Sequence, residues 1–140
     1  MSQSGSPLSQ EERDAFVTLI NVTQQAYENR DLDGYISAFA DDYHSFALPY
    51  DLAEDKAALR RKMEREFARY RMKKMEFEVK RLAFVGNRAY AYLSYHTTLE
   101  ADDTTVTDTR ENLIVGVFED GKWRFESKIV LRVGGKPQES

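Results

Sequence analysis

The 140-residue sequence contains no cysteine, which excludes disulfide bonds, thiol catalysis and thiolate metal sites. It has only two histidines, His44 and His96, so a zinc site made by protein groups alone would also need carboxylates. We predict neither a metal site nor a cofactor. An excess of basic charge is missing as well, since the net charge is -4. We therefore expect neither nucleic acid nor an anionic membrane among the partners.

Long hydrophobic runs are also missing. No apolar segment is long enough to cross a bilayer, and the first ten residues, MSQSGSPLSQ, lack the charged segment and the apolar stretch of a signal peptide. A cytoplasmic protein is therefore expected. Hydrophobic residues make up 41% of the chain, which is enough to build the core of one domain. We expect that domain over residues 10–133, with flexible tails at residues 1–9 and 134–140.

Helical patterns occupy the first half of the chain. Ser9 and Glu12 have the spacing of a capping box and begin an amphipathic helix that runs to about Asn29. Asp31 can cap a short second helix, and a third helix is expected over roughly residues 55–71. The basic residues of the third helix alternate with glutamates, which is typical of a solvated face.

After Met72 the apolar period changes from that of a helix to that of a strand. Three turn signals, Gly86-Asn87, Asp102-Asp103 and Asp120-Gly121, divide the rest of the chain into a meander of four antiparallel strands. Residues 43–48 are a predicted fifth strand. Because the helices come first and the strands later, the expected class is α+β, with the helices on one face of a curved sheet.

Two segments, DLDGYISAFADD at residues 31–42 and EDGKWRF at residues 119–125, resemble the nuclear transport factor 2-like superfamily. The superfamily includes ketosteroid isomerases and polyketide cyclases of the SnoaL type. The resemblance covers about residues 11–133. It implies a cone-shaped, curved antiparallel sheet wrapped around three N-terminal helices, with a central hollow. It also implies a homodimer formed through the sheet.

The ketosteroid isomerases of this superfamily use a tyrosine on the first helix, an aspartate on the first strand and an acid on the third meander strand. Alignment on the two motifs places Thr23, Ala47 and Leu113 at these positions, and a shift of one residue would bring Phe46 or Leu48 to the position of the base. An apolar side chain can neither abstract a proton nor donate one to an oxyanion. We therefore do not expect steroid isomerase activity.

His96 and Glu111 are the predicted catalytic residues. A two-residue turn at residues 102–103 pairs Ser94 with Glu111 and His96 with Thr109. If Leu113 faces the hollow, as the resemblance implies, His96 and Glu111 face it too and are diagonal neighbours. A buried Glu111 would have a raised pKa and serve as a general base.

Two other readings of the same strands stay open. His96 and Glu111 could form an ordinary exposed cross-strand pair. Alternatively, a one-residue bulge would reverse the faces and turn Tyr95, Arg110 and Asn112 towards the hollow instead.

The function predicted from these patterns is the binding of a small, mostly apolar molecule in the hollow. One alternative is a lyase, isomerase or cyclase of the SnoaL type, with Glu111 or His96 as general base. Another is a dimeric structural or interaction domain whose hollow is filled by its own side chains. Tyr90 and Tyr92 are among the aromatic residues assigned to inner faces, and the predicted ligand-binding residues are Thr23, Tyr27, His44, Tyr92 and Leu113.

Overall fold

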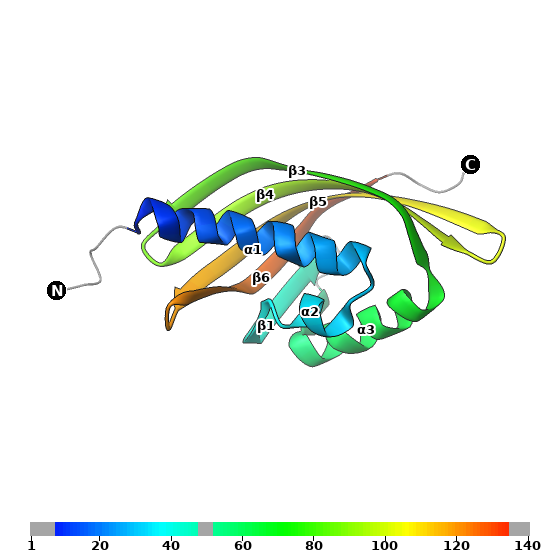
Figure 1. Ribbon diagram of the computed structural model, residues 1–140, viewed down its shortest axis with the longest axis horizontal. Helices are drawn as coiled ribbons and strands as arrows, with labels where there is room; N and C mark the ends of the chain where they lie inside the picture. Colours follow the sequence, from blue (N-terminus) through cyan, green and yellow to red (C-terminus); the bar gives the residue numbers. More distant parts are fainter. Residues whose placement is uncertain (1–7, 48–51, 135–140) are drawn as a thin grey trace.

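The computed structural model describes residues 8–47 and 52–134. Within these ranges the chain forms an α+β fold of three helices and one curved sheet (Figure 1). The predicted tail residues 1–7 and 135–140 lie outside the described residues, as do Leu48 and Pro49. The elements in order are α1 (Gln10–Glu28), α2 (Leu32–Ile36), β1 (Phe39–Ala47), β2 (Leu52–Asp55), α3 (Lys56–Arg69), β3 (Arg71–Val85), β4 (Arg88–Ala101), β5 (Thr104–Glu119) and β6 (Lys122–Gly134).

The helices begin at the residues that the capping patterns indicate. The Ser9 hydroxyl accepts a hydrogen bond from the Glu12 amide, and the Glu12 carboxylate accepts one from the Ser9 amide, which confirms the capping box. Asp31 caps α2 by accepting from the Gly34 amide, and Asp55 caps α3 by accepting from the Ala58 amide. In each case a side-chain oxygen satisfies an amide that has no partner within the helix.

The sheet has the strand order β2-β1-β6-β5-β4-β3 among the described residues. The predicted meander is confirmed for β3 to β6, and its turns fall at the expected pairs, with positive φ at Gly86, Asp102, Asp120 and Gly121. Two features differ from the expected all-antiparallel arrangement. Strand β1 pairs with β6 in parallel, and the short β2 extends the sheet beyond β1. A strand of four residues carries too little alternation to be recognised from the sequence.

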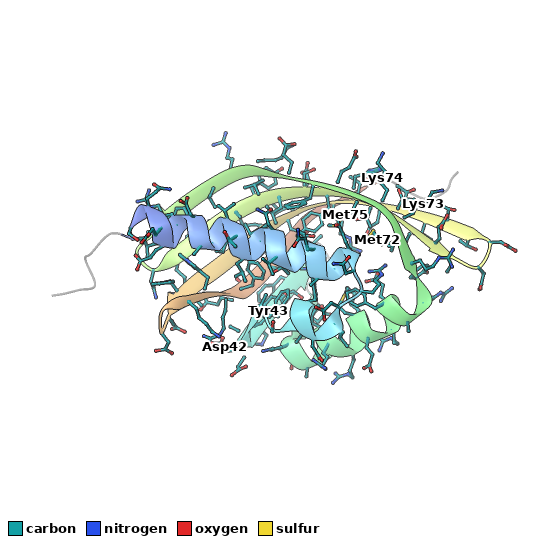
Figure 2. All side chains as sticks on the ribbon, viewed as in Figure 1. Asp42, Tyr43, Met72, Lys73, Lys74 and Met75 are labelled. Atoms are coloured by element: carbon teal, nitrogen blue, oxygen red, sulfur yellow. The ribbon has the colours of Figure 1, made fainter. Side chains whose placement is uncertain are left out.

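All three helices lie on the concave side of the sheet. Figure 1 shows α1 lying over the sheet, α2 and α3 beside its C-terminal half, and the β4–β5 hairpin projecting past them. Strand β3 bends where it follows α3, and the pairing with β4 shifts between Met72 and Lys74. Lys73 and Lys74 are both exposed at this bulge, whereas Met75 is partly buried (Figure 2). The extra residue increases the local twist, which helps to curve the sheet.

Aromatic side chains fill the space between α1 and the sheet. Phe16 is fully buried and contacts Trp123, with the ring centroids 5.0 Å apart. Trp123 also donates a hydrogen bond of 2.7 Å to the Glu12 carbonyl, which fastens the start of α1 to β6. A Cβ atom at Gly116 would collide with the Phe16 ring, so the glycine allows α1 to approach β5 closely. Phe16, Trp123 and Phe125 are all buried and belong to the core.

From Asp42 to Phe46, side chains of β1 alternate between solvent and the core. Tyr43 is fully buried and its ring contacts Phe39 at a centroid distance of 4.7 Å, whereas Asp42 is exposed (Figure 2).

Among the described residues, no helix has the length and the apolar character that a membrane span requires.

Candidate functional site

A cavity of about 70 Å³ lies between the helices and the concave face of the sheet. We call it the inner cavity. Since one water needs about 10–15 Å³ by this measure, the inner cavity has room for roughly five waters, or for a molecule of a few heavy atoms. Its lining is polar and includes five charged side chains. The lining residues are Gln24, Tyr27, Tyr35, Leu59, Lys62, Met63, Glu66, Tyr95, Thr97, Asp108, Arg110, Asn112 and Lys128.

The pleat of β4, β5 and β6 determines which side chains form the sheet wall of the inner cavity. Tyr95 pairs with Arg110, so both side chains lie on the same face, and Asn112 follows two residues along β5. Lys128 joins them because Asn112 pairs with Val130, two residues further along β6. The Tyr95 hydroxyl accepts a hydrogen bond from Gln24 Nε2 of α1 at 3.3 Å. This contact shows that the face carrying Tyr95 is the one that the helices cover.

Two amide oxygens at the inner cavity have no hydrogen-bond partner among the described residues. They are Gln24 Oε1 and Asn112 Oδ1, and the two residues are only 7% and 2% exposed. A buried polar atom without a partner destabilises a fold by about 1–3 kcal/mol. Native proteins satisfy nearly all such atoms through protein, water or ligand. The inner cavity therefore presents two acceptors that suit the N–H or O–H groups of a bound molecule.

The charged side chains of the inner cavity come from three elements. On β5, Arg110 Nε and Asp108 Oδ2 form an ion pair at 2.9 Å. On α3, Lys62 and Glu66 lie across from them. On β6, partial burial lowers the pKa of Lys128 to about 8, and the nearby charges of Lys62 and Arg110 act in the same direction. The amine of Lys128 is therefore partly neutral near physiological pH.

Three tyrosines complete the inner cavity. Burial raises the pKa of Tyr27 to about 12, and the carboxylate of Glu66 adds to this effect. Burial also raises the pKa of Tyr35 and of Tyr95. All three hydroxyls keep their protons at neutral pH, so they are available as hydrogen-bond donors.

The prediction that His96 and Glu111 line the hollow is wrong, although the predicted pairing of β4 with β5 is confirmed. Ser94 pairs with Glu111 and His96 with Thr109, and the faces are those of the alternative reading. The Glu111 carboxylate accepts a hydrogen bond of 2.8 Å from the Tyr92 hydroxyl. Tyr92 and Glu111 lie on the face of the sheet that is turned away from the helices. We call this face the outer face. His96 is exposed there and its Nδ1 lies 2.9 Å from Thr109 Oγ1.

The error arose at Leu113. The resemblance implied that Leu113 faces the hollow, but its neighbours Asn112 and Ile114 are the buried residues of this stretch. Because side chains alternate along a strand, a displacement of one residue exchanges the two faces. Tyr90 and Tyr92 were assigned to inner faces for the same reason and also lie on the outer face.

The other predicted ligand-binding residues occupy different places. Tyr27 lines the inner cavity, as expected for a residue one turn after Thr23. His44 is exposed on the outer face, where its Nδ1 donates a hydrogen bond to the Asp42 carbonyl at 2.9 Å. At the expected position of the base, Phe46 is exposed and nothing is described of the Ala47 side chain.

Thr23 lines a second, apolar cavity of about 360 Å³, which we call the α1 groove. It runs between α1, the end of α2 and the β5–β6 turn. The Thr23 hydroxyl donates to the Leu19 carbonyl at 2.7 Å and is thus satisfied within α1. The lining residues are Ala15, Thr18, Leu19, Val22, Thr23, Gly34, Ser37, Ala38, Phe118, Gly121, Lys122, Trp123 and Arg124.

Sequence reasoning missed Lys128, Asp108, Lys62, Glu66 and Gln24. Lys128 could not be placed, since the pairing with β5 shifts after Phe125 and moves the following residues to the other face. A usable signal was present on β4, where Ala89, Ala91 and Leu93 alternate with tyrosine and serine. Small and purely apolar residues are those that a closely packed helix requires. That signal would have directed Tyr95, in the same alternation, to the inner cavity.

The model of the SnoaL-like domain family matches residues 22–126, three quarters of the chain. The chain belongs to the SnoaL-like domain family. This places it in the nuclear transport factor 2-like superfamily, as the motifs indicated. No match to this SnoaL-like domain is found among curated proteins.

Solved structures support the same fold. The SnoaL-like domain is similar to a ketosteroid isomerase-like protein from Erwinia carotovora atroseptica, with 15% identity, a TM-score of 0.72 and coverage of 89% of this chain and 99% of the other. A conserved protein from Planctomyces limnophilus has 15% identity, a TM-score of 0.78 and coverages of 88% and 98%. An NTF2-like protein from Cytophaga hutchinsonii has 15% identity, a TM-score of 0.72 and the same coverages of 88% and 98%. These TM-scores show that the fold is the same, but at 15% identity they do not show a shared reaction. The function has to be inferred from the site residues.

Metal binding has no evident support in the described part of the SnoaL-like domain. Within residues 8–47 and 52–134, no three histidine, aspartate or glutamate side chains are grouped so that they could hold an ion. The lining of the inner cavity includes amides, tyrosines and an amine, all of which can form hydrogen bonds.

Proposed function

We propose that this protein binds a small, oxygen-containing organic molecule in the inner cavity. The observation that carries the proposal is the pair of buried amide oxygens, on Gln24 and Asn112, without partners among the described residues. A ligand with hydroxyl or N–H groups would satisfy them. The cations Lys62, Arg110 and Lys128 and the protonated tyrosines suit carbonyl or carboxylate oxygens on the same ligand.

The ligand proposed here is more polar than the mostly apolar one that the sequence indicated. Five charged side chains line the inner cavity, and its volume of about 70 Å³ is well below the roughly 300–1,000 Å³ of pockets for drug-sized ligands. A short hydroxy acid or oxo acid has the size and the groups that this lining can satisfy.

The proposal is tested by NMR titration of the labelled protein with lactate, glycolate and pyruvate. We expect saturable shifts at Asn112, Tyr95 and Gln24. Asn112→Leu should weaken binding at least tenfold, because it removes an acceptor without removing volume. Two matched controls should bind as the natural chain does. Glu111→Gln changes the neighbouring residue on the outer face, and Val22→Lys fills the α1 groove from a residue that is 51% exposed. Equal weakening by Asn112→Leu and Glu111→Gln would contradict the proposal.

The α1 groove is the other place where a small molecule could bind, and it suits an apolar one. The same titration with indole separates the two sites. Shifts confined to Leu19 and Val22 that disappear in Val22→Lys would move the binding site to the groove. Absence of saturable binding by all four compounds would favour a structural or interaction domain instead.

A lyase, isomerase or cyclase is the second candidate function. Glu111 and His96 lie on the outer face, so a reaction in the inner cavity would need a different base. Glu66, Asp108 and the neutral form of Lys128 are the lining groups that can accept a proton. Unchanged turnover in Glu111→Gln with loss in Asp108→Asn or Lys128→Met would support the enzyme with this reassignment.

We also propose that two copies pair through the outer face. Phe46 pairs with Ile129, Ile129 with Leu113, and Leu113 with Tyr92, so these side chains form one row across β1, β6, β5 and β4. Phe46 is 40% exposed, and none of the three helices covers this face. An apolar row of this kind on a sheet is a typical association surface.

Light scattering after size-exclusion chromatography tests the pairing. The natural chain should have twice the mass of the 16.2 kDa monomer, and Phe46→Glu should shift it to the monomer. Val22→Lys, which introduces a charge on α1, is the control and should leave the mass unchanged. A monomeric natural chain would contradict the proposed dimer. A cytoplasmic location stays a prediction, which fractionation of the producing cells would test.

A further inference from the structure

We propose that Lys128 is a nucleophilic amine that forms an imine with a small aldehyde or ketone bound in the inner cavity. The inference rests on the proposed function, since it requires that a carbonyl compound enters the cavity. It goes beyond that function by naming the reacting group and the chemical class of the substrate. It also differs from a proton-transfer role, because a covalent bond forms between the protein and the substrate.

The position of Lys128 is the first argument. Its side chain lies on the concave face of β6 and lines the inner cavity together with Asn112 and Tyr95. Lys128 makes no ion pair and no side-chain hydrogen bond with any other residue in the part of the chain that the structure describes. Lys128 is half-buried, so its ammonium loses part of its hydration without an anionic partner to compensate, which is costly. Lys128 thus contributes to the lining of the cavity without being engaged by a neighbouring side chain of the described residues.

The electrostatic surroundings of Lys128 are the second argument. Removal from water and the positive charges of Lys62 and Arg110 favour the neutral amine, while Glu54 and Glu66 oppose this effect more weakly. The remaining charged group at the cavity, Asp108, is engaged with Arg110. A desolvated lysine beside other cations is the arrangement that prepares an amine for attack on a carbonyl group.

The other lining groups suit the two steps of imine formation. In the first step, the ammonium releases one proton, the lone pair of the neutral Nζ forms a bond to the carbonyl carbon, and the π electrons of C=O move to oxygen. A proton then passes from nitrogen to that oxygen to give the carbinolamine, and the released proton returns to its hydroxyl in the second step. Tyrosine hydroxyls that remain protonated can donate a hydrogen bond to that oxygen. In the second step, the carbinolamine loses its hydroxyl as water, and the nitrogen lone pair forms the C=N bond. The balance is one carbonyl compound and one lysine ammonium giving one protonated imine and one water, without oxidant or reductant.

The size of the inner cavity restricts the substrate. A space of about 70 Å³ admits acetaldehyde, acetone or pyruvate, whereas an aromatic aldehyde would need the helices to move. The unpartnered amide oxygens favour a substrate that also carries a hydroxyl or N–H group. A short hydroxy aldehyde or oxo acid is therefore the expected class.

Reductive trapping tests the inference on the full chain. The protein is incubated at pH 7 with acetaldehyde or pyruvate and sodium cyanoborohydride, and modified lysines are located by peptide mass spectrometry. At pH 7 the neutral fraction is about 0.1 for a pKa of about 8 and about 0.0003 for the ordinary lysine value of 10.5. Because a weaker base is also a weaker nucleophile, we expect Lys128 to react about tenfold faster than the exposed Lys122. Benzaldehyde should show no such preference.

Variants separate reactivity at Lys128 from general effects. Lys128→Met should remove the fast adduct, since it takes away the amine and keeps most of the length of the side chain. Glu111→Gln, on the outer face, is the control and should keep the adduct at Lys128. If Lys128→Met fails to fold, competition in the natural chain replaces it. Excess lactate, which has no carbonyl group, should then slow trapping at Lys128 and leave trapping at Lys122 unchanged. Equal labelling of Lys128 and Lys122 overturns the inference.

The outcome also distinguishes this inference from the proposed function. NMR shifts of Asn112 and Tyr95 with pyruvate, without an adduct at Lys128, would overturn the imine and leave ligand binding intact; Lys128 would then bind the carboxylate as an ammonium. Absence of both shifts and adduct would overturn both proposals. Shifts, a fast adduct at Lys128 and slower trapping in Asn112→Leu are the results expected.

Discussion

The two faces of β4 and β5 carry polar groups of very different character, although the side chains of both faces alternate along the same two strands. On the outer face, Tyr92 donates to Glu111 and His96 lies beside Thr109, all at exposed or partly exposed positions. On the inner face, Tyr95 and Asn112 are enclosed by the helices, and Asn112 keeps an acceptor without a partner. The predicted catalytic residues His96 and Glu111 thus face away from the helices, whereas the enclosed face carries an amide, a phenol, an amine and the ion pair of Asp108 with Arg110.

The comparison teaches that enclosure, more than residue type, makes a side chain reactive. On an open face, water screens the charge of a histidine or glutamate side chain from neighbouring charges. Withdrawal from water raises the pKa of Tyr95 and lowers that of Lys128.

Two leucines on neighbouring strands measure the difference in packing. Leu93 lies on the inner face and is 1% exposed, so Leu93→Ala should lower the free energy of unfolding by about 2–5 kcal/mol. Leu113→Ala removes the same atoms from a partly exposed site on the outer face and should lower it by about 1 kcal/mol. Urea denaturation at low protein concentration measures both. Equal losses would mean that the outer face is covered as completely as the inner one.

The pH dependence of stability reports on Lys128. The pKa of this amine is about 8 in the folded state and near 10.5 when unfolded, so the unfolded chain binds more protons between these values. The contribution of Lys128 to stability therefore increases as the pH rises from about 8 to 10.5. Below pH 8 this contribution is at its lowest. Lys128→Met should be more stable than the natural chain at pH 7, by about 1–3 kcal/mol, with allowance for partial exposure.

Urea titrations of both proteins between pH 6.5 and 10 check this expectation. The advantage of Lys128→Met should shrink steadily as the pH rises above 8. Measurements should stop at pH 10, because above that value the raised pKa of Tyr27, about 12, makes the folded state bind more protons and stability falls for a separate reason. A constant difference across the range would show that Lys128 titrates normally.

Asn112→Leu should stabilise the free protein slightly while it removes binding. The substitution replaces a buried amide, whose oxygen has no partner among the described residues, by an apolar group of similar volume. A gain of about 1 kcal/mol is expected, as is common when a binding group is removed from a cavity. Thermal unfolding with and without pyruvate measures both effects. A loss of stability would indicate that internal water already satisfies the amide.

The outer-face pair should give the smallest effects. Tyr92→Phe removes the hydrogen bond to Glu111 and should cost about 0.5–1.5 kcal/mol. His96→Ala should change stability by less than about 0.5 kcal/mol, because the residue is exposed. Neither variant should alter ligand binding in the NMR titration. Weaker binding in His96→Ala would connect the outer face with the inner cavity and remove the contrast.

Much of the fold could be predicted because its signals are local. The capping box at Ser9, the cap at Asp31 and the turns at Asp102 and Asp120 depend on side chains and backbone within four residues, and each was recognised. The pairing of β4 with β5 followed from the length of one turn. The parallel pairing of β1 with β6 joins segments about 80 residues apart, and no local pattern announces it.

The candidate site was far less accessible to prediction. Of the predicted ligand-binding residues, Tyr27 lines the inner cavity and Thr23 lines the α1 groove, while His44, Tyr92 and Leu113 lie on the outer face. The strand partners were known, but the direction of the pleat was not, and a pleat reversed by one residue exchanges every side chain.

By itself the sequence determined the class of fold, the helix starts, the turns and the pairing of β4 with β5, because these depend on contacts between close residues. Only the tertiary structure decided that Asn112 and Lys128 face the helices and that Glu111 does not. Which face is inner depends on where α1 lies, and α1 is held by Trp123 and by the close approach of Phe16 to Gly116. Burial is a property of the assembled layers, and the chemistry of Lys128 follows from that burial.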